Sequence, residues 1–165
     1  MKNRRHPRAV VVMAIAATFI FSGCGVGETS DLPQVTDARV GQPTGPNAAL
    51  YLTARGYGDT DTLIAAATDA AETVEIHQTT SNDDGTMGMR PVGSLDLPAD
   101  GELVLEPGGY HIMLIGADRQ DIGAMIEVTL TWSKAGEQTI QAVVVDPSET
   151  MDHMDSDMDM EESGG

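Results

Sequence analysis

The sequence predicts an all-β fold, a Greek-key sandwich or barrel of about seven to nine short strands with disordered segments at both ends. Three observations support this fold class. Short segments that alternate apolar and polar residues recur between positions 37 and 145, and Gly-, Pro-, Asn- and Asp-containing turns separate them. No segment keeps a helical period over ten residues. The apolar fraction of 41% is sufficient for a buried core.

Each strand is predicted from its own alternation of apolar and polar residues. Val74 and Ile76 share one face of the strand over residues 73–77, because successive side chains in a strand point to opposite faces. The Asn-Asp-Asp-Gly sequence at 82–85 is a turn, in which glycine accepts a positive φ. The remaining predicted strands cover residues 48–54, 63–67 (a strand or half-strand), 102–105, 110–115, 126–132 and 139–145.

Residues 1–23 have the composition of a secretory signal peptide, with four basic residues in the first eight positions and an apolar run over 9–21. As a helix this run would be about 20 Å long, too short to span a bilayer. The Phe-Ser-Gly-Cys sequence at 21–24 resembles the bacterial lipobox, at whose Cys the peptide is cleaved and a lipid attached. We therefore expect an exported lipoprotein, anchored through Cys24 on the outer face of the bacterial cytoplasmic membrane. An ordinary signal peptide with an incidental Cys is the alternative.

The chain after the signal peptide is predicted to have three parts. Residues 24–36 are rich in Gly, Ser, Thr and Pro and form a flexible tether, residues 37–145 form the β-domain, and residues 146–165 form a disordered tail. The whole chain has 26 acidic and only 9 basic residues, which excludes nucleic acid as a partner. Its single Cys excludes an intramolecular disulfide, a zinc ribbon and a CxxC redox site.

Three side chains able to bind a metal lie on predicted strands, on faces that the core does not use. His111 and Met113 are two residues apart and share one face, while Ile112 and Leu114 face the core. His77 likewise points away from its apolar neighbours. Soft thioethers with imidazoles favour copper(I), and the absence of a thiolate argues against a blue-copper centre. The alternative is that such Met residues fill the core and such His residues are merely exposed.

The spacing of these residues resembles that of the PCu(A)C copper chaperones. In that family a His, usually followed by Met, precedes ten residues, a Met, 21 residues and a His-x-Met motif. Here His77 and Gln78 precede ten residues and Met89, and 21 further residues lead to His111-Ile112-Met113. The surrounding stretches at 87–92 and 107–114 are also close to the family's sequences. Gln78 departs from the pattern, since the family often has Met there.

The resemblance implies a cupredoxin-like β-sandwich that binds copper(I) through His77, Met89, His111 and Met113. It also implies a chaperone rather than an enzyme, and no combination of nucleophile, base and oxyanion donors suggests catalysis. Members of the family deliver copper to the copper centre of cytochrome c oxidase or to another copper chaperone. A copper-buffering or copper-resistance lipoprotein without a dedicated client is the alternative function.

The acidic tail suggests a second, weaker metal site. Its residues interleave thioethers, one imidazole and carboxylates; the candidate donors are Met151, His153, Met154, Met158 and Met160. Thioethers suit copper(I), whereas an imidazole with carboxylates suits copper(II). The alternative is a solubilising charged tail in which the Met residues have no role.

Overall fold

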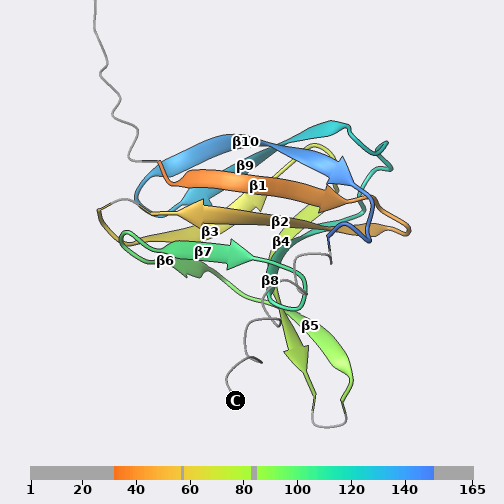
Figure 1. Ribbon diagram of the computed structural model, residues 1–165, viewed down its shortest axis with the longest axis horizontal. Helices are drawn as coiled ribbons and strands as arrows, with labels where there is room; N and C mark the ends of the chain where they lie inside the picture. Colours follow the sequence, from red (N-terminus) through yellow and green to blue (C-terminus); the bar gives the residue numbers. More distant parts are fainter. Residues whose placement is uncertain (1–31, 57, 83–84, 151–165) are drawn as a thin grey trace, which may run out of the picture.

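The computed structural model describes residues 32–56, 58–82 and 85–150, and these residues form ten β-strands (Figure 1). The all-β prediction is confirmed, with slightly more strands than expected. In this part of the chain no helix has the length and apolarity that crossing a membrane requires. The strands are β1 (Gln34–Gly41), β2 (Asn47–Arg55), β3 (Asp61–Ala67), β4 (Thr73–Ser81), β5 (Met87–Pro91), β6 (Leu95–Leu97), β7 (Glu102–Leu105), β8 (Tyr110–Ile115), β9 (Met125–Trp132) and β10 (Gly136–Val145).

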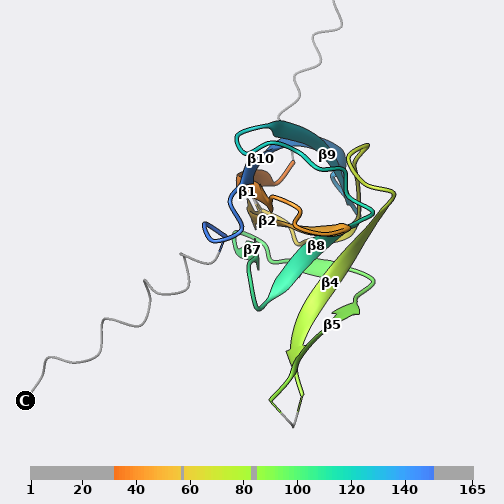
Figure 2. The same cartoon turned by 90° about the vertical axis from the view of Figure 1, so that its right-hand side faces the viewer.

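The strands join into one mixed, strongly curved sheet. Its order is β5-β4-β8-β2-β1-β10-β9-β3-β6, and β7 also pairs with β2. The β1–β10 pair is parallel, and the other pairs between described strands are antiparallel. The sheet curls until β3 contacts β4, so that it wraps around a closed interior (Figure 2). This curvature leaves β4, β8 and β2 with one face toward the core and the other toward solvent.

Alternate residues of the central strands fill the interior. Leu50 and Leu52 of β2 and Ile112 of β8 face Val128 and Trp132 of β9 in one apolar core, and each is no more than 1% exposed. The indole Nε1–H of Trp132 donates to the side-chain oxygen of Gln138, so the one polar atom of this buried ring is satisfied. The polar positions between these residues therefore belong to the outer face.

Strand β1 begins at Gln34, within the stretch expected to be a tether, and it was not predicted as a strand. Its alternation is interrupted by a bulge: Asp37 has a φ of 54°, and the pairing with β2 shifts between Thr36 and Arg39. A bulge inserts an extra residue and bends the strand, which removes the simple period of two. The same irregularity brings Arg39 opposite Tyr51 on the outer face of the sheet.

The hairpin formed by β4 and β5 extends beyond the core, as the two views show (Figures 1 and 2). Met87, Met89 and Arg90 of β5 are all exposed, so neither face of this strand is covered. The guanidinium of Arg90 donates to the amide oxygen of Gln78, 2.6 Å away, on the face opposite Met89. Gln78 therefore does not line the face that carries the candidate ligands.

The first residues of the expected tail pack against the domain. Asp146 accepts hydrogen bonds from the hydroxyl and the backbone N–H of Ser148, and Thr150 donates from its hydroxyl to the carbonyl of Pro147. Thr150 is only 5% exposed. The remaining tail residues from 151 onward, and residues 1–31, lie outside the described part of the chain.

Candidate metal centre

Strand register places the four candidate ligands on one face of neighbouring strands β5, β4 and β8. His77 of β4 is directly opposite His111 of β8. On β4, Glu75 lies two residues before His77 and is opposite Met113 of β8. Thr79 lies two residues after His77 and is opposite Met89 of β5. Because side chains alternate along a strand, all four ligands leave the same face of the sheet. His77 is central, with His111 beside it and the two Met residues at diagonal positions.

The two imidazole rings are neighbours under partial cover. Their centroids are 5.8 Å apart and the ring planes are tilted by 53°. The ring of Tyr51, on β2, lies 6.3 Å from that of His111 on its other side. His111 is only 3% exposed and the side chain of His77 only 12%. Although these His residues lie on the outer face, as predicted, their neighbours bury them.

Each ring has one hydrogen-bonded nitrogen and one without a partner. The Nε2–H of His77 donates to the Glu75 carboxylate, 2.8 Å away, and the ring of His111 hydrogen-bonds to the backbone of Gly109. The Nδ1 of His77 and the Nε2 of His111 are buried and have no partner. A carboxylate only accepts hydrogen bonds, so it fixes the tautomer in which the Nδ1 of His77 holds a lone pair.

These two nitrogens have the properties of metal ligands. Leaving a buried polar atom unsatisfied costs about 1–3 kcal/mol, and a bound cation would remove that cost. Ligating His residues usually donate the other ring N–H to a carboxylate or backbone carbonyl, as His77 and His111 both do here. The residues present therefore fit a metal ion held between β4 and β8.

Burial lowers the pKa of His111, and the neighbouring His77 lowers it further, against the opposing effect of the Gly109 backbone hydrogen bond. The ordinary value for the imidazole is 6.5. A lowered pKa keeps His111 neutral at pH 7. Its unpartnered Nε2 therefore offers a lone pair to a cation rather than a proton.

The thioethers complete the set of donors. Among residues 32–56, 58–82 and 85–150, no three or more His, Cys, Asp and Glu side chains converge to hold a metal. Oxygen and nitrogen donors alone therefore do not build a site here. Met113 is half-buried beside His111, and Met89 is 59% exposed at the rim. Two imidazoles with two thioethers suit copper(I).

Sequence reasoning missed two residues of this site. Glu75 lies two residues before His77 and so shares its face, a signal that alternation alone contains. Tyr51 reaches the site from β2, and only the β2–β8 register reveals it. Cys24 and the predicted tail ligands Met151, His153, Met154, Met158 and Met160 lie outside the described residues.

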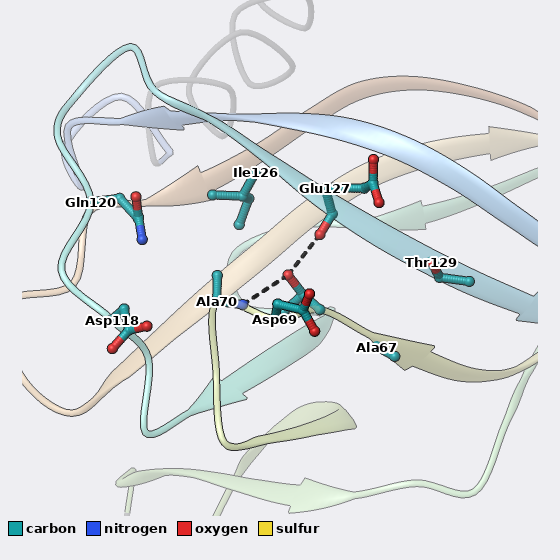
Figure 3. A pocket seen from close by; sticks show the side chains of 9 residues that line it. Ala67, Asp69, Ala70, Asp118, Gln120, Ile126, Glu127 and Thr129 are labelled. Atoms are coloured by element: carbon teal, nitrogen blue, oxygen red, sulfur yellow. Dashed lines mark hydrogen bonds between the residues drawn. The ribbon is translucent and has the colours of Figure 1, made fainter.

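A separate pocket of about 420 Å³ lies between β3, β9 and the loop before β9, and it contains none of the candidate ligands (Figure 3). Its wall is held together by Thr68, whose hydroxyl donates to the carbonyl of Glu127 and accepts from the N–H of Ala70. Asp69 and Asp118 also line it, but these carboxylates do not converge with Glu127 into a metal-binding group. The pocket therefore carries no second candidate centre.

Comparison with known proteins identifies the family of this chain. Residues 33–144 match the family model described as "Putative lipoprotein LpqE-like". "Putative lipoprotein Lxx21020" of Leifsonia xyli subsp. xyli is 28% identical over 156 residues, which cover 88% of this chain and 93% of the relative.

Two solved structures share the fold. The apo PCuAC domain from PmoF1 is 26% identical, with a TM-score of 0.60 over 70% of this chain and 94% of that domain. The solution structure of CuI-DR1885 from Deinococcus radiodurans is 28% identical, with a TM-score of 0.57 over 73% of this chain and 83% of that protein. The predicted resemblance is thus confirmed: the chain belongs to the LpqE-like lipoprotein family, whose β-domain here has the PCuAC fold.

Proposed function

We propose that this protein is an extracytoplasmic copper(I) metallochaperone whose domain binds one copper ion through His77, Met89, His111 and Met113. One observation carries the proposal: two buried imidazole nitrogens without partners belong to directly opposed residues of adjacent strands. Thioethers on the same face supply the soft donors that select copper(I). The copper(I) form of the similar protein DR1885 supports the same choice of metal.

The arrangement suits a cargo that must be released. All four donors are neutral, so copper(I) binding requires only that the imidazoles be unprotonated. The buried rings provide the fixed part of the site, and Met89, 59% exposed, provides the part that a partner reaches first. An incoming thiolate can replace the exposed thioether while the imidazoles still hold the ion.

The proposed client is the copper centre of cytochrome c oxidase or another copper chaperone, and a lipid on Cys24 would hold the protein at the membrane where oxidase assembly occurs. A copper-buffering lipoprotein is the alternative. Transfer separates the two functions: a chaperone loads an apo oxidase copper-centre fragment within a specific complex, whereas a buffer releases copper to it no faster than to a small chelator of equal affinity.

The ligand assignment is tested by Met113→Leu, which removes the sulfur and nearly conserves the volume. In the chain starting at residue 25, competition with a chromogenic copper(I) chelator should show an affinity at least about tenfold lower, because even groups that only support a ligand are worth that much. Met125→Leu is the control, since Met125 is 56% exposed and lies on β9 outside the site.

An unchanged copper(I) affinity in Met113→Leu would contradict the assignment of this ligand. The same titration in a chain ending at residue 150 measures the proposed second equivalent in the tail. Two equivalents in the longer chain and one in the shorter chain are expected. Equal stoichiometry in both chains would remove the tail from the proposal.

A further inference from the structure

We infer that Met87 and Met89 together form a second, transient copper(I) site on the projecting β4–β5 hairpin, through which the ion enters and leaves the buried centre. This inference rests on the proposed function and adds a residue, Met87, that has no part in the four-ligand centre. It concerns how the copper ion is exchanged rather than how firmly it is held.

Register places the two thioethers side by side. Met87 is opposite Ser81 and Met89 is opposite Thr79, so both side chains leave the face of the hairpin that carries His77. Residues two apart in a strand have Cα atoms about 6.5–7 Å apart. Met side chains have three rotatable bonds, so both sulfurs can reach one ion between them.

Packing does not explain Met87. It is 63% exposed and belongs to a strand that has no core on either face. The opposite face of the hairpin is polar, where Arg90 donates to Gln78. The usual reason for a Met in a strand, filling a gap in the core, therefore does not apply here.

The donors along this face are ordered by exposure. Met87 and Met89 are 63% and 59% exposed, Met113 is half-buried, the side chain of His77 is 12% exposed, and His111 is 3% exposed. Met89 belongs to both sets of donors and lies between Met87 and His77. A copper ion moving inward thus passes from two solvent-facing thioethers to a site with imidazoles that water barely reaches.

Each step of this path is a ligand exchange without electron transfer. Copper remains copper(I) throughout; one thioether lone pair leaves the ion as an imidazole or thioether lone pair binds it. Two neutral thioethers hold copper(I) less firmly than the complete centre, so the outer site exchanges rapidly. Its thioether donors bind soft monovalent ions. Silver(I) is such an ion and can therefore serve as a redox-inert probe of the site.

The experiment compares Met87→Leu with Met125→Leu in the otherwise complete chain from residue 25, which retains the tail. Met125 is matched to Met87 in exposure, 56% against 63%, but lies on β9. With a chelator in excess, the rate constant of copper(I) release should fall about tenfold in Met87→Leu, comparable to the loss of a group that supports a metal site. The equilibrium affinity should stay at the wild-type value, and Met125→Leu should change neither quantity.

A second measurement observes the site directly. In a His77→Gln chain with ¹³C-labelled Met methyl groups, which lacks the central ligand of the tighter site, silver(I) should shift the methyl signals of Met87 and Met89 together, and should leave that of Met125 in place. Equal release rates in the two variants with no shift of the Met87 signal would overturn the inference, while a retained wild-type affinity would leave the proposed function intact. An affinity loss in Met87→Leu equal to that in Met113→Leu would also overturn it, because Met87 would then be a ligand of the centre itself. Failure of the wild-type domain to bind copper(I) would refute both.

Discussion

Removing the Glu75 carboxylate should weaken copper(I) binding, although Glu75 is not among the proposed ligands. Its Oε2 lies 2.8 Å from the Nε2 of His77 and fixes the tautomer that leaves Nδ1 free. Loss of such a supporting group typically costs about 10–100-fold in metal affinity, or about 1.4–2.7 kcal/mol. The Glu75 side chain is 43% exposed, so water takes over part of its role. We therefore expect Glu75→Ala to lie near the lower limit, about tenfold.

Two further variants give this prediction a control and a rescue. In Glu75→Gln an amide oxygen can still accept from the Nε2–H of His77, so most of the affinity should return. Glu102→Ala is the matched control, because Glu102 is also 43% exposed and pairs with a cation, Arg55, far from the site. Copper(I) affinity is measured by chelator competition, and the His77 tautomer is observed in ¹⁵N spectra of the metal-free chain.

The result expected for Glu75→Ala is a weaker affinity together with a shift of the His77 tautomer population. A merely structural role for Glu75 would not change the tautomer. Wild-type affinity with an unaltered tautomer in Glu75→Ala would refute the reasoning, and so would an equal loss in Glu102→Ala.

Two predictions concern stability. Burial lowers the pKa of His111 below 6.5, so below that pH the unfolded chain binds a proton that the folded chain excludes. Urea unfolding at pH 7.5 and 5.5 should therefore show a larger loss of stability on acidification in wild type than in His111→Gln. Equal losses in the two proteins would contradict this prediction. Burial acts to raise the pKa of Asp61, but its hydrogen bonds from three backbone amides outweigh this and lower it. Asp61→Ala should therefore destabilise the domain by about 2–3 kcal/mol at pH 7, because the hydrogen bonds to this carboxylate are lost. The destabilisation should be smaller below pH 3.8, because there the unfolded wild-type chain binds a proton at Asp61 that the folded chain accepts only at a still lower pH. Denaturant unfolding at both pH values measures this, and an equal loss at both would be the contrary result.

The sequence predicted the strands whose two faces have different environments. β2 and β9 alternate cleanly because one face packs on the core and the other meets solvent. β5 was missed because both of its faces are exposed, so its sequence shows no alternation of apolar and polar residues with a period of two. β1 was missed because the bulge at Asp37 breaks its alternation. A pattern can reveal a strand only where packing differs between its faces.

The candidate site was predictable in part for the same reason. Alternation placed His111 and Met113 on one face, but the opposition of His77 and His111 depends on the register between two strands more than 30 residues apart. Met89 entered the set only through the family resemblance. The burial of His111 depends on Tyr51 from a third strand, which no local pattern contains. These contacts belong to the tertiary structure, because they depend on how the sheet curves rather than on the sequence of any one segment.

The described part of the chain ends in a packed segment, whose last residue, Thr150, is buried. Thr150 lines a cavity of about 200 Å³ with Arg39 and Thr53 on the outer face of the sheet. The guanidinium of Arg39 lies 5.9 Å from the ring centre of Tyr51, which in turn lies beside His111. Thr150, the last residue that the structure describes, therefore lies on the same side of the sheet as the candidate copper centre. A copper site in the tail, as proposed above, would be joined to this centre by a short connection, and two sites joined in this way meet at effective concentrations of about millimolar order. Any exchange of copper between them would be intramolecular, and its rate would not change when the protein is diluted.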